Sequence, residues 1–427
     1  MLRTVCLGLA LVGVACGNGV LTRPSPPDAS MNDAPGSNDG SPMADAAPAL
    51  DASRPDAPRS RGAVDVLFMI DNSSEMSSMQ DKLVAQLPAF VSALAGLPGG
   101  MPDLHVAVVS SDMGAPGDVT SSIGCTASGD DGAFQTVPRG TCTSSGLVGG
   151  ATFISNVAGA ANYAGSLADV LSCIVPLGDT GCGFEHQLAA VVRALGADGA
   201  PPPPGNAGFL RPDAELAIFV LTNEDDCSAP ADTTLYSLNG GQQSVANPLG
   251  PIRNYRCNQF GHLCQDPTGP QPDAWLPPPL AIPADAAGDP PKLALSACVS
   301  NDGPDGLLTP VATFIQQIEA LKTDPARIVV GGTIAPPTPY TVAWMPPASP
   351  PAGTSGELWP FTMHSCGGPG SYGTSPGAQI VVDGSFGDPG VRVGQWVQAL
   401  GGFTTSVCDP DYAAALQTFA AAIGQHL

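Results

Sequence analysis

The fold of this 427-residue chain is decided by the stretch Val64-Asp65-Val66-Leu67-Phe68-Met69-Ile70-Asp71-Asn72-Ser73-Ser74-Glu75. Its first seven residues are almost all apolar, which is typical of a strand buried on both faces of a parallel sheet. Asn72, Ser73 and Ser74 favour the start of a helix, and apolar side chains recur along one face of residues 83–94. The stretch therefore predicts a buried strand, a polar turn and an amphipathic helix in succession.

The same alternation of strand and helix continues through the rest of the chain. Further strands are predicted at residues 104–110, 214–221 and 327–334, with an edge strand at 403–407. Further helices are predicted at residues 160–174, 184–195, 311–321 and just before Leu400, with a C-terminal helix over 412–423. Strands that alternate with helices predict a doubly wound α/β domain over residues 63–427, with a mostly parallel sheet.

Two long stretches interrupt this pattern. Residues 229–307 and 335–390 are dense in Pro, Gly and Cys, in a chain that holds 52 Gly and 46 Pro. Both are too long to be ordinary loops. They predict insertions that are pinned by disulfides at the carboxyl edge of the sheet.

The N-terminus predicts export. Arg3 precedes a short apolar run, so residues 1–16 are interpreted as a signal peptide. Gly13-Val14-Ala15-Cys16 resembles a bacterial lipobox, in which Cys16 would carry the lipid and anchor the protein, with Gly17 favouring the outer membrane over the inner. Ordinary signal-peptidase cleavage before Cys16 is the alternative. Residues 17–62 are rich in Pro, Ala, Ser and Asp, and predict a disordered tether.

The cysteine count agrees with an exported chain. Ten of the twelve cysteines remain after Cys6 and Cys16 are set aside, and an even number outside the cytosol predicts up to five disulfides. The ten are Cys125, Cys142, Cys173, Cys182, Cys227, Cys257, Cys264, Cys298, Cys366 and Cys408. Sequence alone does not fix their pairing, but close spacing favours Cys125–Cys142, Cys173–Cys182 and Cys257–Cys264. Zinc is a poorer interpretation, because the sequence has no Cys-x-x-Cys.

The net charge of −23 argues against nucleic acid as a partner, because such a chain repels phosphate backbones. Three predicted strands end in turns rich in oxygen ligands, at residues 71–75, 110–112 and 222–226. The carboxyl ends of parallel strands meet at one edge of a sheet. Carboxylate and hydroxyl oxygens there predict a site for Mg²⁺ or Ca²⁺.

An apolar strand that ends in Asp-x-Ser and leads into a helix resembles the metal-ion-dependent adhesion site of von Willebrand factor A domains. The motifs at residues 181–185 and 221–227 also resemble a cysteine-containing subgroup of bacterial A-domain lipoproteins. The resemblance implies a metal whose open position takes an acidic group of a protein partner. The ligand set that it implies, with the Asp112 turn added, is Asp71, Ser73, Glu75, Asp112, Thr180, Asn223 and Asp225.

This set departs from the family pattern in each loop. Glu75 stands where the family has a second Ser, and Asn223 where it has Asp. The register of the second loop puts Cys182 or Gly183 at the Thr position, with Glu185 as a substitute ligand. Without a metal, Asp71 and Ser73 would form a helix cap, and Asp225 would lie in a solvated loop.

The sequence therefore predicts a binding or adhesion module of the cell envelope with a protein ligand, and not an enzyme. Two alternatives stay open. One is a structural envelope lipoprotein whose metal site has lost its function. The other is an exported hydrolase, which the absence of a His-Glu-x-x-His motif disfavours.

Overall fold

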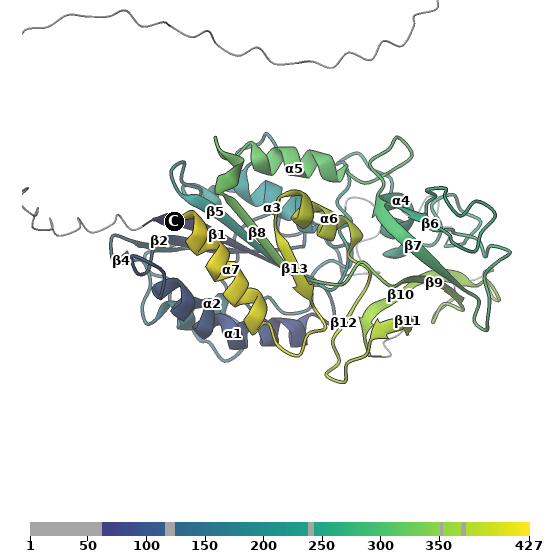
Figure 1. Ribbon diagram of the computed structural model, residues 1–427, viewed down its shortest axis with the longest axis horizontal. Coiled ribbons are helices and arrows are strands. Elements are labelled where there is room, and N and C mark those ends of the chain that lie inside the picture. The colour runs from purple at the N-terminus through teal and green to yellow at the C-terminus, as the bar shows by residue number, and fades with distance from the viewer. Residues whose placement is uncertain (1–61, 116–123, 238–242, 351–352, 369–372) are drawn as a thin grey trace, which may run out of the picture. The chain divides into compact units, whose positions relative to one another are not determined.

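A computed structural model describes residues 62–115, 124–237, 243–350, 353–368 and 373–427 (Figure 1). The predicted signal peptide, the lipidation site Cys16 and residues 17–61 of the predicted tether lie outside these ranges. Within them, no helix has the length and apolar character needed to cross a bilayer.

A seven-stranded sheet, here called the core sheet, forms the centre of the described chain. Its strand order is β13-β8-β5-β1-β2-β3-β4. The strands are β1 (Ala63–Ile70), β2 (Asp103–Ser110), β3 (Ile154–Val157), β4 (Ala160–Ala161), β5 (Glu215–Leu221), β8 (Ile328–Ile334) and β13 (Phe403–Ser406). Neighbours from β13 to β2 are parallel, whereas β3 and β4 add an antiparallel edge.

Helices cover both faces of the core sheet (Figure 1). One face packs on α1 (Ser77–Ala95), α2 (Leu167–Ile174) and α7 (Ala413–His426), and the other on α3 (Gln187–Leu195), α5 (Val311–Glu319) and α6 (Val391–Ala399). β1 alternates between them, since Val66 and Phe68 join the first apolar cluster and Leu67 and Met69 the second. Full burial of such a side chain contributes roughly 1.5–3 kcal/mol. The predicted doubly wound α/β fold is confirmed.

The two predicted insertions build one structure, here called the second sheet, which lies beside the core sheet (Figure 1). Its order is β11-β10-β9-β7-β6, and β12 also pairs with β10. The elements are α4 (Tyr255–Gly261), β6 (His262–Gln265), β7 (Lys292–Ser300), β9 (Tyr340–Met345), β10 (Trp359–Gly367), β11 (Thr374–Gln379) and β12 (Phe386–Gly387). Two 3-10 turns, Pro204–Asn206 and Pro325–Arg327, complete the described elements.

Five disulfides form among the ten candidate cysteines, but the predicted local pairs are wrong. The bridges are Cys125–Cys182, Cys142–Cys173, Cys227–Cys257, Cys264–Cys298 and Cys366–Cys408. Sequence spacing failed because the sheet topology, and not the nearest cysteine along the chain, decides which thiols meet. Cys227–Cys257 and Cys366–Cys408 join the second sheet to the core, since Cys227 follows β5 and Cys408 follows β13.

Two predicted helices begin later than expected. Residues 160–161 belong to β4, and α2 starts only after Ser166, whose side chain accepts the N–H of Asp169 in a capping box. The helix predicted from residue 184 begins at Gln187. The chain before it forms a loop at the carboxyl edge of the core sheet.

Candidate functional site

Asp71 ties together the turns that follow β1, β2 and β5. Its Oδ1 accepts the Ser73 N–H at 2.8 Å and the Ser111 hydroxyl at 3.1 Å, and its Oδ2 accepts the Thr222 hydroxyl at 2.7 Å. Its own N–H donates to the Leu221 carbonyl at 2.9 Å. The predicted convergence of oxygen-rich turns at one sheet edge is therefore present around a fully buried carboxylate.

The loop before α3 is held against the same edge. The Gln80 amide on α1 donates to the Asp71 carbonyl and to the Gly178 carbonyl, each at 2.8 Å. The Gly181 N–H donates to the Asn72 carbonyl at 2.7 Å, and a Cβ on Gly181 would lie 2.3 Å from the Asn72 side-chain oxygen. A larger residue at this position would force the Asn72 side chain to move, so glycine allows the loop to lie close to the turn after β1.

Glu185 and Glu224 add two more carboxyl groups beside Asp71. Burial raises the pKa of Glu185 well above its usual range, and the nearby Glu224 and Asp71 charges raise it further. Burial likewise raises the pKa of Glu224, with Asp388 and Asp71 adding to the effect. The interaction between the two carboxyl groups raises the pKa of Glu185 and lowers that of Glu224. The cluster is a set of like charges that bind protons more tightly than isolated carboxylates do.

Two buried neutral side chains, in the turns after β1 and β5, have polar atoms without partners among the described residues. Among the described residues, neither the Ser73 Oγ nor the Oδ1 and Nδ2 of Asn223 makes a hydrogen bond of normal geometry, although both side chains are buried. Burial raises the pKa of Asp71, and the nearby Ser73 hydroxyl offsets part of this rise. Buried polar atoms normally have partners, so these two side chains fit the contact of a bound water or cation.

The chemistry of this donor set fits a hard cation. Asp71, Glu185 and Glu224 offer carboxylate oxygens, and Ser73 and Asn223 offer neutral oxygens, which are the ligands that Mg²⁺ and Ca²⁺ prefer. Among the described residues, no three His, Cys, Asp or Glu side chains are close enough to hold a metal ion by themselves. The hydroxyl and amide oxygens would therefore be needed to complete the coordination.

The predicted ligand Asp225 has a different task in the structure. Its Oδ2 accepts His262 Nε2 at 2.7 Å and the N–H groups of Val391 and Arg392 at 2.9 and 2.8 Å, and its Oδ1 accepts the Val393 N–H at 3.0 Å. Burial would raise the pKa of Asp225, but these hydrogen bonds lower it below its usual value. The carboxylate caps the start of α6 and fastens it to the second sheet.

The other predicted ligands lie around the site without forming one cluster. Asp112 folds its own turn, because its Oδ1 accepts the Gly114 N–H at 2.9 Å; burial raises its pKa. Glu75 and Thr180 line a pocket next to the Asp71 site. Glu75 is exposed and takes a positive φ of 75°, a conformation that costs a non-glycine residue energy.

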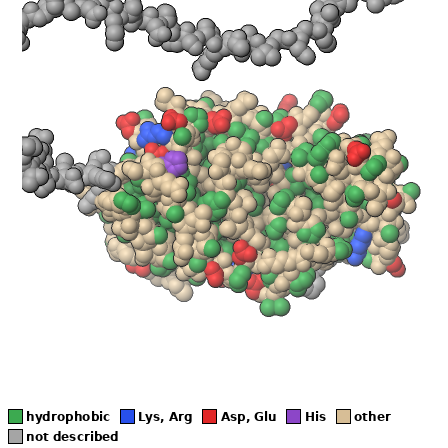
Figure 2. Space-filling view, in the orientation of Figure 1, with side chains coloured by type: hydrophobic (Ala, Val, Ile, Leu, Met, Phe, Trp, Pro, Cys, Tyr) green, Lys and Arg blue, Asp and Glu red, His purple; other side chains and the backbone are tan. Residues whose placement is uncertain are grey.

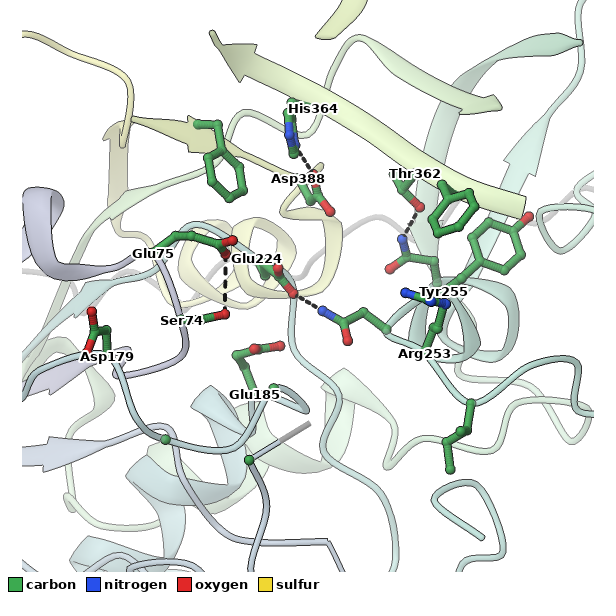
Figure 3. Close-up of a pocket in the computed structure, with 18 of the residues that line it drawn as sticks. Ser74, Glu75, Asp179, Glu185, Glu224, Arg253, Tyr255, Thr362, His364 and Asp388 are labelled. Atoms are coloured by element: carbon green, nitrogen blue, oxygen red, sulfur yellow. Dashed lines mark hydrogen bonds and ion pairs between the residues drawn. The ribbon is translucent and has the colours of Figure 1, made fainter. Parts of the chain in front are cut away.

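This pocket, here called the acidic pocket, has a volume of about 890 Å³ and lies between the core sheet and the second sheet. Figure 3 shows the carboxyl groups of Glu75, Glu224 and Asp388 turned toward its centre. The carboxyl edge of the core sheet gives one wall, with Glu75, Asp179 and Glu185. The second sheet and the chain before α4 give the other. This second wall includes Arg253, Tyr255, Trp359, Phe361, Thr362, His364, Phe386 and Asp388.

Sequence reasoning missed the second wall because its residues lie in the two insertions, where no periodic pattern marks a face. A polar network orders the side chains there. The Asn254 amide donates to Glu224, and the Asn258 amide donates to the Thr362 hydroxyl. The insertions therefore complete the pocket that the core sheet begins.

Comparisons with known proteins add little to this picture. No family model matches the chain, and no match is found among curated proteins. Among solved structures, the chain is similar to the pilus adhesin RrgA from Streptococcus pneumoniae, with 12% identity over 40% of this chain and a TM-score of 0.19. The chain spans only 21% of the length of that adhesin. A similarity at this level supports neither a shared fold nor a shared function.

Proposed function

We propose that the protein is an exported binding module of the von Willebrand factor A type, anchored to the cell envelope through Cys16, whose ligand site is the acidic pocket. The topology of the core sheet supports the class, since a parallel sheet with helices on both faces places the Asp-x-Ser turn after β1. The five disulfides support export, because such bridges persist outside the reducing cytosol.

One observation carries the choice of site. The Asp71 carboxylate accepts hydroxyl groups from the turns after β2 and β5, and ligands of open α/β sheets bind at the carboxyl ends of the strands. A divalent cation held by Asp71, with the neutral oxygens of Ser73 and Asn223, would offset the charge of the nearby Glu185 and Glu224, which line the acidic pocket. Binding, and not catalysis, is the role we assign to these residues.

Calorimetric titration tests the cation. Mg²⁺ and Ca²⁺ are titrated into protein that has been treated with EDTA and dialysed, and the melting temperature is recorded with and without each ion. Wild-type protein should bind one of the ions, and Asp71→Asn should weaken that binding at least about tenfold, as loss of a metal-site group does. Asp273→Asn changes an exposed carboxylate that is not part of the pocket lining, and should bind as wild type does.

Two outcomes would contradict a cation at this site. One is that neither ion gives heat or shifts the melting temperature of wild-type protein. The other is that folded Asp71→Asn binds the ion as tightly as wild type does.

A further inference from the structure

The second wall of the acidic pocket already holds one cation of the chain itself. The Arg253 guanidinium carbon lies 5.2 Å from the centre of the Trp359 ring and 5.3 Å from that of the Phe361 ring. Both rings belong to β10, and Phe386 of β12 adds another aromatic side chain to the same wall. The face of an aromatic ring attracts cations, so this wall offers a surface suited to positive charge.

His364 gives the second and independent sign of a ligand. Its Nδ1 lies 2.6 Å from Asp388 Oδ1, its ring centre lies 4.2 Å from that of Phe386, and the residue is 2% exposed. Its Nε2 has no hydrogen-bond partner among the described residues, although the side chain lines the pocket. In a neutral ring whose Nδ1–H donates to Asp388, Nε2 is an acceptor, and it therefore lacks a donor.

The charge of the pocket indicates what kind of ligand would donate to His364 Nε2. Its described lining carries carboxyl groups on Glu75, Asp179, Glu185, Glu224 and Asp388, against the guanidinium of Arg253. A divalent cation at the Asp71 cluster would leave the three carboxylates of Glu75, Asp179 and Asp388 against the single positive charge of Arg253. Figure 2 shows that one face of the protein also carries scattered Asp and Glu side chains and few Lys or Arg. Such a field attracts positive ligands and repels acidic ones.

We infer that the second wall of the acidic pocket binds an alkylammonium group, as carried by a lysine side chain of a partner protein or by a free polyamine. His364 Nε2 accepts an N–H of the ammonium, Asp388 balances its charge and the ring of Phe386 attracts the charged end. This inference rests on the proposed function in taking the pocket as a ligand site, and it replaces the acidic partner group that the family resemblance implies with a basic one.

The test uses calorimetry in the presence of EDTA, so that its outcome does not depend on a divalent cation. The probes are 1,5-diaminopentane, Nα-acetyl-lysine methylamide, and the same lysine derivative acetylated on Nε, which keeps the chain but removes the charge. One or both amines should bind, and Nε-acetylation should weaken binding of the lysine derivative at least about tenfold, the size of a lost charged hydrogen bond. Preference for the diamine or for the lysine derivative distinguishes a free amine from a protein side chain.

Variants of the wall locate the binding. Asp388→Asn should weaken binding of the preferred amine at least about tenfold, and Phe386→Leu by about two- to fivefold, as loss of an exposed cation–π contact does. Asp273→Asn removes the same charge as Asp388→Asn from an exposed position outside the lining, and should leave binding unchanged. Melting temperatures confirm that each variant is folded.

Three results would overturn the inference. They are no binding of either amine at millimolar concentration, equal binding of the charged and the Nε-acetylated lysine derivatives, and wild-type amine affinity in both Asp388→Asn and Phe386→Leu. Each leaves the separate Mg²⁺ and Ca²⁺ titration untouched, so a failure of the amine site is distinguished from a failure of the cation site.

Discussion

The core sheet and the second sheet are held together by different forces. In the core sheet, β1, β5 and β8 are almost wholly buried and pack their side chains into two apolar clusters. In the second sheet, β7 alternates buried and exposed positions around a smaller cluster, and Cys264–Cys298 joins it to β6. The second sheet also contains the buried strands β9 and β10, but its apolar cluster is smaller, so specific bridges contribute more to its stability.

The junction between the two sheets is concentrated in the turn after β5. Three consecutive residues there each fasten a different partner. Asp225 accepts His262 of β6, Asp226 accepts the buried Arg392 of α6 at 3.1 Å, and Cys227 is bridged to Cys257 of α4. The acidic run that resembles a metal loop is thus mainly the joint that sets the second wall of the pocket against the first.

The largest expected effect follows from breaking this joint at Arg392. Its guanidinium is fully buried, donates to Asp226, and also donates to the Ser300 hydroxyl at 2.8 Å and the Thr309 carbonyl at 2.7 Å. Arg392→Met leaves the Asp226 carboxylate buried without its positively charged partner, although it keeps its hydrogen bonds with Leu188 and Ser228. Loss of one member of a buried ion pair costs about 3–5 kcal/mol. Urea denaturation measures the loss in the free energy of unfolding.

An exposed ion pair supplies the control for Arg392. Arg193 pairs with Asp131, whose side chain is 60% exposed. Arg193→Met should cost at most about 1 kcal/mol, because solvent screens such pairs. A loss below about 1 kcal/mol for Arg392→Met would show that the two sheets do not depend on this contact.

The next effect compares two disulfides with similar loop lengths. Cys227–Cys257 closes 30 residues and joins the two sheets, whereas Cys264–Cys298 closes 34 residues within the second sheet. Replacing either pair by alanine should cost about 2–4 kcal/mol, since the cost depends mainly on the loop that each closes. Only loss of Cys227–Cys257 should also weaken ligand binding in the acidic pocket, because α4 carries its lining residues Tyr255 and Asn258.

Calorimetry with the ion or amine that wild-type protein binds, together with urea denaturation of each variant, checks this difference. Equal loss of binding in both double-alanine variants would mean that the pocket responds to stability in general. Retained binding in both would mean that α4 keeps its place without the bridge.

The same contrast explains what the sequence could predict about the fold. The strands β1, β2 and β5 were found because each is a mostly apolar run of seven or eight residues followed by a helical pattern. The short edge strands β3 and β4 were not found, and residues 160–161 were predicted as helix. The strands of the second sheet carry no such signal. β10 contains Pro360, and β11 contains Pro376 and Gly377, residues that ordinarily argue against a strand.

The candidate site divides in the same way. The Asp71 turn was found because parallel strands place their carboxyl ends together, so that neighbours in space follow from topology. His364 and Asp388 could not be placed, because their position depends on how the second sheet folds back on the core. The role of Asp225 could not be foreseen either, since an acidic side chain after a strand can hold a metal or cap a helix, and only the location of His262 decides between them.

The smallest predicted effect on stability concerns Glu185, in the wall of the pocket that the core sheet supplies, and it depends on pH. The pKa of Glu185 is raised well above the value of 4.5 that is usual for Glu, so the folded state binds this proton more tightly than the unfolded state. Its contribution to stability is complete below about pH 4.5 and is lost as pH rises through the raised pKa. Glu185→Gln cannot ionise, and should gain roughly 1–3 kcal/mol over wild type toward pH 8 but little at pH 4.

Free energies of unfolding in urea at pH 4, 6 and 8, measured in EDTA, test this difference between the curves. The control is Glu319→Gln, because Glu319 is a half-buried residue of α5 outside the pocket lining. Its free energy of unfolding should change with pH as that of wild type does. The divalent cation that wild type binds should raise the stability of wild-type protein most at pH 8, because protons and the cation compete for the same carboxyl groups. If the stability of Glu185→Gln changes with pH as that of wild type does, the pKa of Glu185 is not raised in the folded protein. A cation near Glu185 would then have no repulsion between carboxylates to reduce.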